Sequence, residues 1–296
     1  MSGHLFDSSY RYCGRVFTAR EIERIRHLIA SEPKPNRLEL SKLVCDELQW
    51  LRLDGRLKDM SCRVAMLRMH RDGLICLPLP QTKNGNGKNC PKLSTASDPQ
   101  NPISAPAHEL GNLLLQPLSL PQETSLWNEL IQRYHYLGHT PLPGAQMKYF
   151  VFSSSGYLLA ALGFGAAAWK VAPRDRFIGW SLEQRMSNLH LIVNNARFLI
   201  LPWIASPNLA SRILSIAAKQ LPFDWQIRYN YQPVLLETFV QKNRFKGTCY
   251  RAANWLLLGQ TQGRGKLDQY NKRPLPIKDI FVYPLNKSFR QILCHS

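Results

Sequence analysis

Residues 194–258 read NNARFLILPWIASPNLASRILSIAAKQLPFDWQIRYNYQPVLLETFVQKNRFKGTCYRAANWLLL, and this stretch decides the fold. Its apolar run at 197–202 (RFLILP) is short and bounded by a proline, which is typical of a buried strand. Asn208 is expected to cap the helix that follows, and the apolar run at 234–240 (VLLETFV) predicts a second buried strand. Asn243 is expected to cap a second helix. This alternation implies parallel strands joined by right-handed crossovers, and therefore an α/β layered domain.

A carboxylate interrupts the second of these apolar runs. Glu237 lies in the middle of the predicted strand, where a charge is costly unless it is paired. One interpretation is that Glu237 pairs with Arg251 or Arg197 and holds the core together. The other is that it faces a cleft at the carboxyl ends of the strands, where ligands of open α/β sheets bind, and works there as a general base.

Charge is the most informative part of the composition. The chain has 296 residues and a formal net charge of +18. Residues 147–296 hold 20 Lys and Arg against 6 Asp and Glu, whereas residues 1–78 hold 14 against 10. A domain this basic is expected to bind polyanions, with nucleic acid as the first candidate and a membrane surface as the second. No basic amphipathic helix supports the second candidate.

The sequence also predicts where the protein works. No apolar run approaches the roughly 20 residues of a membrane span, and the N-terminus lacks the apolar core of a signal peptide. Seven cysteines at scattered spacings do not suggest a disulfide framework. We therefore expect a cytoplasmic protein without a membrane partner.

Residues 1–78 predict a small helical domain. Capping boxes at Thr18 and Asn36 predict the starts of two helices, the stripe at 62–69 marks a third, and a short strand is expected at 74–77. Three helices followed by a strand is the order of a winged helix-turn-helix domain, which places its third helix in the major groove of DNA. The alternative is a plain helical bundle with a solvated basic face. The candidate DNA contacts are Arg56, Lys58, Arg63, Arg68 and Arg71.

Residues 79–106 are rich in Pro, Asn, Ser and Gly and predict a flexible linker. The second domain, residues 107–296, begins with a predicted helix at 125–136 and an antiparallel hairpin at 148–164. It ends with a basic loop, a strand at 277–282 and a short helix. The predicted fold class is thus α/β, with a winged-helix-like helical domain in front of a mixed-sheet domain. The loop adds four candidate phosphate contacts: Arg264, Lys266, Lys272 and Arg273.

The element order of the second domain resembles the GNAT acyltransferase superfamily. In that superfamily, the loop between the fourth strand and the next helix holds the pyrophosphate of an acyl-coenzyme A. The matching residues here are 204–211 (IASPNLAS), which lack the family's glycines, and Pro207 removes a backbone donor. The resemblance therefore implies a GNAT-like fold more than it implies acyl transfer.

Several motifs together are similar to the family of the Druantia anti-phage protein DruA, and the domain of that family also occurs on transposable elements. The motifs are RYHYLG, GAAAWK, PRDRFIGW, NNARFLILPW, NLAS, LLETFV and GTCYRAANW. The segments GRVFTAREIERIRHLI and GRLKDMSCRVAMLRMH resemble the helical domain found in front of it. The resemblance implies a role in phage defence or in a mobile element, and it supplies no catalytic mechanism.

Metal and cofactor chemistry find little support in the sequence. Too few acidic residues lie in predicted core strands for the three-carboxylate cluster of a DDE transposase, and neither a P-loop nor a zinc-spaced cysteine set is present. His135 and His139 are four residues apart, but Gly138 interrupts the helix, so we expect structural or phosphate contacts from them. What remains is a polar arrangement that could bind nucleotides or form a core network: His135, Tyr136, Asn195, Arg197, Glu237, Tyr250, Arg251 and Asn254.

Two functions follow from these patterns. The first is a DNA-binding protein of an anti-phage system or mobile element, whose further candidate partners are other defence or transposon proteins. In it, Arg197, Arg251 and Asn254 join the basic residues named above as nucleic-acid contacts. The alternative is an enzyme, either an acyltransferase or a nucleic-acid-modifying activity. Its catalytic candidates are Glu237 as base, with His135 and Tyr250.

Overall fold

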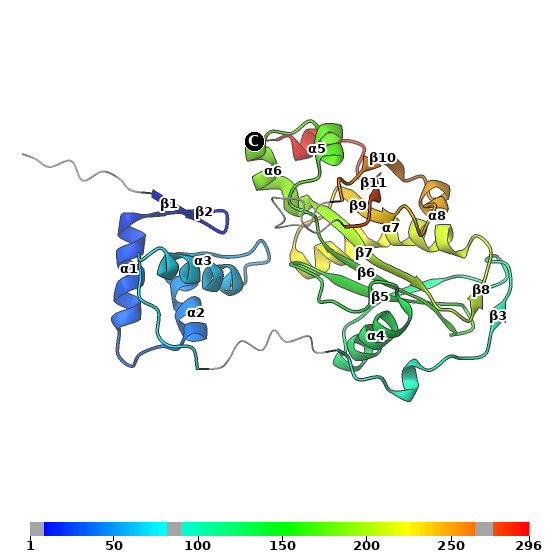
Figure 1. Ribbon diagram of the computed structural model, residues 1–296, viewed down its shortest axis with the longest axis horizontal. Coiled ribbons are helices and arrows are strands. Elements are labelled where there is room, and N and C mark those ends of the chain that lie inside the picture. The colour runs from blue at the N-terminus through cyan, green and yellow to red at the C-terminus, as the bar shows by residue number, and fades with distance from the viewer. Residues whose placement is uncertain (1–8, 82–89, 264–274, 296) are drawn as a thin grey trace, which may run out of the picture. The chain divides into compact units, whose positions relative to one another are not determined.

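A computed structural model describes residues 9–81, 90–263 and 275–295 (Figure 1). The chain divides into two compact units, Met1–Asn89 and Cys90–Ser296. The division lies later than the predicted end of the first domain. Ser94 donates from its backbone N and its Oγ to Glu129 Oε2, at 2.8 and 2.7 Å, so this part of the predicted linker packs on the second unit.

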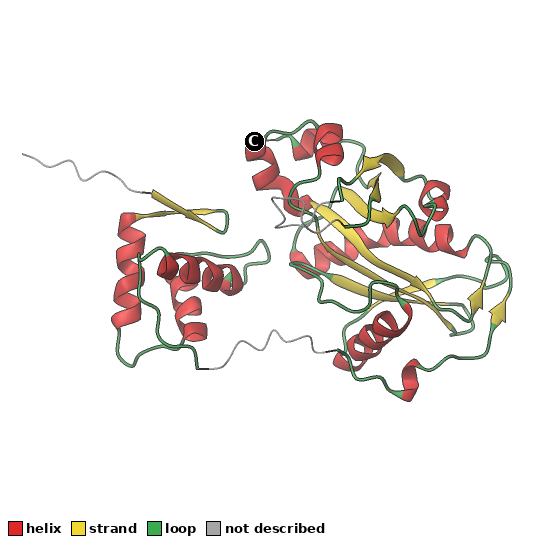
Figure 2. Cartoon of the chain, in the orientation of Figure 1, coloured by secondary structure: helices red, strands yellow, loops and turns green. Residues whose placement is uncertain are grey.

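The first unit is a hairpin followed by three helices (Figure 2). Both predicted capping boxes are present, Thr18 with Glu21 and Asn36 with Glu39. The unit has its own core, in which Phe17 packs edge-on against Trp50. Its elements are β1 (Ser9–Tyr12), β2 (Arg15–Thr18), α1 (Ala19–Ala30), α2 (Arg37–Glu47) and α3 (Asp59–Arg71).

The prediction of a short strand at 74–77 is wrong. Residues 74–77 form no strand, and the hairpin of this unit precedes its helices. The apolar side chains of Ile75 and Leu77 are buried in the core of the unit, which explains why that segment looked like a strand. His70 Nδ1 lies 3.1 Å from the carbonyl oxygen of Ile75 and helps to hold this segment against α3.

The second unit is built on a seven-stranded mixed sheet in the order β10-β11-β9-β7-β6-β5-β4. Strands β7 and β9 are parallel, as predicted, and the other neighbours are antiparallel. The order confirms the predicted mixed sheet of an α/β domain. The strands are β4 (Leu114–Pro117), β5 (Met147–Phe152), β6 (Leu158–Ala166), β7 (Ile192–Ile200), β9 (Leu235–Gln241), β10 (Leu256–Gln260) and β11 (Lys278–Pro284), and β3 (Ile103–Ser104) pairs separately with β8 (Ile204–Ala205).

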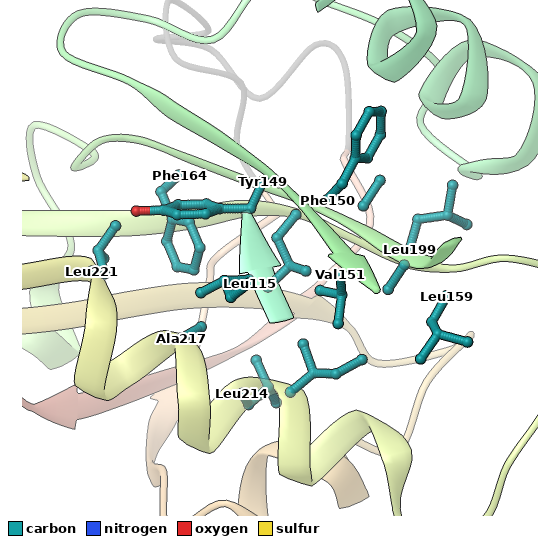
Figure 3. Packing of buried hydrophobic residues seen from close by; sticks show 14 of the residues in the cluster. Leu115, Tyr149, Phe150, Val151, Leu159, Phe164, Leu199, Leu214, Ala217 and Leu221 are labelled. Carbon is teal, nitrogen blue, oxygen red and sulfur yellow. The ribbon is translucent and has the colours of Figure 1, made fainter. Parts of the chain in front are cut away.

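Helices α4 (Pro121–Tyr134) and α7 (Leu209–Tyr229) cover opposite faces of this sheet. Tyr149 donates to Asp224 of α7 at 3.0 Å, whereas the ammonium of the preceding Lys148 lies 4.5 Å from the ring centre of Trp127 in α4. Successive strand residues point to opposite faces, so the two helices form two layers. Figure 3 shows the α7 side, where Leu214, Ala217 and Leu221 point toward the strands.

The remaining helices are short, and two of the predictions about helix starts need correction. Asn208 precedes α7 but adopts a left-handed conformation, and its side chain makes no capping bond. The helix after β9 begins at Thr248 and follows Gly247, so Asn243 does not cap it. These helices are α5 (Ala172–Ile178), α6 (Leu182–Asn188), α8 (Thr248–Ala252) and α9 (Phe289–Leu293), with single 3₁₀ turns at Thr95–Ser97 and Leu189–Leu191.

Candidate functional site

The site lies where β7 and β9 stop pairing. Their ladder covers only Ile192–Asn194 of β7 against Leu235–Glu237 of β9. Beyond that point, side chains bridge the two strands, because Thr238 Oγ1 donates to the backbone oxygen of Asn195 at 3.0 Å. Ligands of open α/β sheets bind where neighbouring strands diverge at their carboxyl ends.

A bulge in β7 distributes the polar residues between the two faces. Gly163 of β6 lies opposite Arg197, and the next residue, Phe164, lies opposite Asn195, so Ala196 is the extra residue. Asn195 therefore faces α8, where its Oδ1 accepts a 2.8 Å hydrogen bond from the Tyr250 hydroxyl. Arg197 faces the α4 side instead, although without the bulge these two residues would share a face.

Arg197 is a buried cation without a carboxylate partner in the described part of the chain. Its side chain donates to Thr140 Oγ1 at 2.6 Å and to the backbone oxygen of Ala196 at 2.8 Å, and the residue is only 8% exposed. Its Nε makes no hydrogen bond. Burial lowers the pKa of Arg197, which indicates how poorly the surroundings compensate the charge. A buried, uncompensated cation is costly unless a ligand neutralises it.

Other positive groups surround Arg197. Burial and, to a smaller extent, the charges of Arg197 and Arg244 together lower the pKa of His135 to about 4. Burial also lowers the pKa of Lys278, with Arg197 adding to the effect. Lys148 is half-buried, donates to Asn128 Oδ1 at 2.8 Å, and has its pKa lowered by burial. We name Lys148, Arg197, Arg244 and Lys278 the cationic cluster, and the imidazoles of His135 and His139, whose pKa values are lowered, lie beside it.

Aromatic rings border the cationic cluster. The guanidinium carbon of Arg244 lies 4.9 Å from the ring centre of Tyr136. The ring centres of Tyr136 and Phe245 are 5.2 Å apart, and those of His135 and Tyr136 are 4.8 Å apart. Positive charge beside planar rings is the combination that binds phosphates and bases of nucleic acids.

Glu237 pairs with neither predicted partner. Its Oε2 accepts a 2.7 Å bond from Arg174 in α5, and its Oε1 accepts a 2.8 Å bond from the backbone N of Ala168. Glu237 and Arg174 are both fully buried, and Asp175 binds Arg174 and Arg185 at 2.8 and 3.1 Å. Burial raises the pKa of Glu237, and Arg174 opposes that rise. With both carboxylate oxygens occupied inside the protein, the geometry suits a structural ion pair, and the expected role as base stays a prediction.

The other predicted residues of this domain do not form one site. Arg251 is exposed, donates to the backbone oxygen of Lys246 at 3.1 Å, and lies 5.7 Å from the ring centre of Phe281. Tyr250 is buried between the sheet and α8, and burial raises its pKa. The structure brings His135, Tyr136 and Arg197 together and joins Tyr250 to Asn195, whereas Glu237 lies with Arg174. The basic loop residues Arg264, Lys266, Lys272 and Arg273 lie outside the described residues.

In the first unit, α3 presents only part of the predicted basic surface. Arg63 lies 3.5 Å from Asp59 and Arg56 lies 4.0 Å from Asp54, so nearby carboxylates partly neutralise both. Lys58 is the residue before α3. Arg68 and Arg71 are exposed, without an ion pair among the residues described for this unit.

A separate groove of about 870 Å³ lies beside the first turns of α7. Its lining includes Asn208 before α7, Ser211 and Lys219 of α7, and Asn254 after α8. Arg212 also lines it, but its guanidinium is tied to the backbone oxygens of Ala107 and Gly111. The groove is thus lined by Asn254 and by Pro207, Asn208 and Ser211, which belong to the 204–211 segment that corresponds to the pyrophosphate-binding loop in the GNAT resemblance.

Neither a metal centre nor a membrane span emerges from the described ranges. No group of three or more His, Cys, Asp or Glu side chains there could hold a metal ion. No helix among those residues is both long and apolar enough to cross a bilayer.

Histidine protonation gives a first test of the cationic cluster. An unfolded histidine titrates near pH 6.5, and the pKa of His135 is about 4 in the folded protein. The unfolded chain therefore takes up the proton first, so the stability contributed by neutral His135 is present above pH 6.5 and is lost as the pH falls toward 4. We expect the melting temperature to fall over this window, and His135→Gln to make the fall shallower.

Melting followed by circular dichroism in acetate and MES buffers measures this effect, because citrate is a polyanion that would itself bind the cluster. His108→Gln is the matched control, since His108 is exposed beside the groove. Equal slopes in wild type and His135→Gln would show that other groups govern the acid sensitivity.

Sequence reasoning missed Lys148, Arg174, Arg244 and Lys278. Lys148 could have been found, because it is the only charged residue of the predicted hairpin. Arg174 stands in the motif PRDRFIGW, but its partner Glu237 is 63 residues away, and no local pattern links them.

Comparison with solved structures gives weak likenesses. The spermidine/spermine N-acetyltransferase SpeG from Vibrio cholerae, in complex with manganese ions, is 10% identical, with a TM-score of 0.39 over 62% of this chain and 98% of that one. The spermidine N-acetyltransferase from Vibrio cholerae in complex with CoA and spermine is 10% identical, with a TM-score of 0.38 over 58% of this chain and 95% of that one. No curated protein matches the sequence.

A protein-family model gives the clearest match. The model of the Druantia protein DruA matches residues 68–274. That range contains β4 to β10, α4 to α8 and most members of the cationic cluster, and it ends before Lys278. The match covers well over half of the chain, so the protein belongs to the DruA family of Druantia proteins.

Proposed function

We propose that this protein binds nucleic acid in anti-phage defence and that its second unit holds the phosphate backbone at the cationic cluster. The family match supports the defence role. The observation that carries the binding role is Arg197, which is 8% exposed and has no carboxylate partner among the described residues. A phosphate oxygen would accept hydrogen bonds from a guanidinium and compensate its charge.

The positive groups around Arg197 support the same ligand. Lys148, Lys278 and Arg244 bring separate positive charges from β5, β11 and the β9–α8 loop to one place. Clustering like charges costs free energy in the empty protein, and a chain of phosphates would relieve that repulsion. A small monoanion would neutralise only part of the set, so a polyanion fits better.

The test is binding of labelled DNA by the full chain at increasing salt, followed by fluorescence anisotropy. Release of counter-ions predicts a logarithmic decrease in affinity with a slope of roughly −0.7 per bound phosphate for single strands and −0.9 for duplex. The absence of binding to either form at low salt would refute the proposal.

The exposed face of α3 is a second proposed binding surface, for duplex DNA. Arg68→Gln with Arg71→Gln is expected to weaken duplex binding and to reduce the salt slope by about two, because each phosphate that is no longer bound reduces it by about one. Arg20→Gln with Lys42→Gln removes two exposed charges from α1 and α2 and serves as the control. Equal salt slopes for the two double variants would contradict this second surface, because the effect would then come only from the lower net charge.

The groove beside α7 supports the alternative function, an enzyme that binds an acyl-coenzyme A. Its volume of about 870 Å³ is large enough for a cofactor-sized ligand. Pro207 contributes no N–H donor there, and the segment lacks glycine. Titration calorimetry with acetyl-coenzyme A separates the two functions, since absence of heat at high concentration would remove the acyltransferase. Other Druantia or transposon proteins stay candidate partners for either function.

A further inference from the structure

The loop between β9 and α8 presents an aromatic ring among positive charges. Phe245 is 44% exposed. Lys242, Arg244 and Lys246 are exposed on either side of it. None of these three cations lies within ion-pair distance of a carboxylate in the described part of the unit.

Planar groups connect this loop to the cationic cluster. The guanidinium carbon of Arg244 lies 5.6 Å from the ring centre of Phe245 and 4.9 Å from that of Tyr136. The rings of Tyr136 and Phe245 meet at 63°, and those of His135 and Tyr136 at 33°. A row of planar groups therefore leads from the half-buried His135 to the exposed Phe245.

A single exposed phenylalanine is common on protein surfaces and needs no explanation of its own. Phe223 of α7 is such a residue, because it is 64% exposed and no cation stacks on its ring among the described residues. Phe245 differs, since it shares a guanidinium with Tyr136 beside an uncompensated set of cations. Aromatic rings beside positive charge bind nucleic-acid bases by stacking while the charge holds the phosphates.

We propose that Tyr136, Arg244 and Phe245 form a stacking site for a base of single-stranded nucleic acid, an inference that rests on the function proposed above. The adjoining phosphate would lie on the cationic cluster. Bases inside a duplex are already stacked on their neighbours, so their faces are not available to a protein ring. A single strand or a frayed end offers such a face without the cost of unpairing.

The experiment compares three labelled ligands on the full chain: a short oligodeoxyadenylate, an abasic strand with the same number of phosphates, and a duplex of the same length. Phe245→Ala is expected to weaken binding of the oligodeoxyadenylate about 5- to 150-fold, the usual range for one stacked base, and to leave binding of the abasic strand unchanged. Phe245→Trp should retain the affinity, and Phe223→Ala should change nothing.

The outcomes separate this inference from the function on which it rests. Equal affinity of the wild-type protein for the oligodeoxyadenylate and the abasic strand, or an unchanged affinity in Phe245→Ala, would overturn base stacking. If both strands still bound with a steep salt dependence, nucleic-acid binding would stand. Binding of polyglutamate as tight as that of the oligodeoxyadenylate would also overturn the inference, because acidic peptides carry no base. Absence of binding to every strand would refute both proposals.

Discussion

Replacing Glu237 by leucine is expected to lower the free energy of unfolding by about 3–5 kcal/mol, the usual loss when one member of a buried ion pair is removed. The change leaves the guanidinium of Arg174 inside the protein, where the residue is fully buried. It also removes the acceptor of the Ala168 backbone N–H. Removing both charges in Glu237→Leu with Arg174→Met should recover much of the loss, since no unpaired charge then stays inside.

Urea unfolding followed by tryptophan fluorescence measures this loss. The indole of Trp180 lies 5.6 Å from the guanidinium carbon of Arg174 and reports on the same network. Arg133→Met is the control, because it breaks the more exposed pair with Asp98 and should cost far less. A double variant as unstable as Glu237→Leu would show that packing, not charge, dominates.

The same variants address the proposed base. Glu237→Gln keeps the shape of the side chain and removes its charge. Phage protection is then compared in Glu237→Gln and Arg185→Met. If each variant loses protection in proportion to its loss of stability, Glu237 supports function only by stabilising the fold. Loss of protection in Glu237→Gln alone, at unchanged stability, would favour catalysis.

Replacing Arg197 by methionine is expected to weaken binding of single-stranded DNA by at least about 2 kcal/mol, or roughly 30-fold, as removal of a buried charged group at an interface does. In the free protein the effect should be small or stabilising. No carboxylate in the described residues loses a partner, and the repulsion exerted on His135 and Lys278 decreases. This combination distinguishes a ligand-binding cation from a structural one.

Fluorescence anisotropy and thermal melting together measure the two effects. Arg197→Lys, which keeps the charge but not the planar fork, should recover part of the affinity. Arg176→Gln, which removes an exposed charge from α5, is the control for net charge. Strong destabilisation of Arg197→Met without DNA would show that the hydrogen bond to Thr140 matters more than the uncompensated charge.

The sequence was sufficient for the parts of the fold that depend on local patterns. Apolar runs bounded by turn residues predicted β7 and β9, and side-chain capping predicted the starts of α1 and α2. The parallel pairing followed from the helix between the two strands. The third predicted helix is also present, as α3.

The sequence was insufficient where long-range interactions decide. The apolar pattern of Ile75 and Leu77 indicates burial, but burial under a helix looks the same as burial in a strand. Glu237 was correctly expected to need a partner. The sequence cannot distinguish Arg174 from Arg197 or Arg251 as that partner, because all three are arginines distant from Glu237 in the chain or on another element. Only the tertiary structure identifies Arg174. The bulge at Ala196 has no signature in NNARFLI, so the separation of Asn195 from Arg197 was hidden.

Because Ala196 is an extra residue in β7, the side-chain alternation before it is out of step with the alternation after it. In the part before Ala196, this places Asn195 against Tyr250 of α8. In the part after Ala196, it places Arg197 on the opposite face of the sheet, next to Thr140. A gain or loss of a single codon anywhere in the strand would invert one half relative to the other. We therefore expect β7 to tolerate exchange of its side chains better than a change in its length.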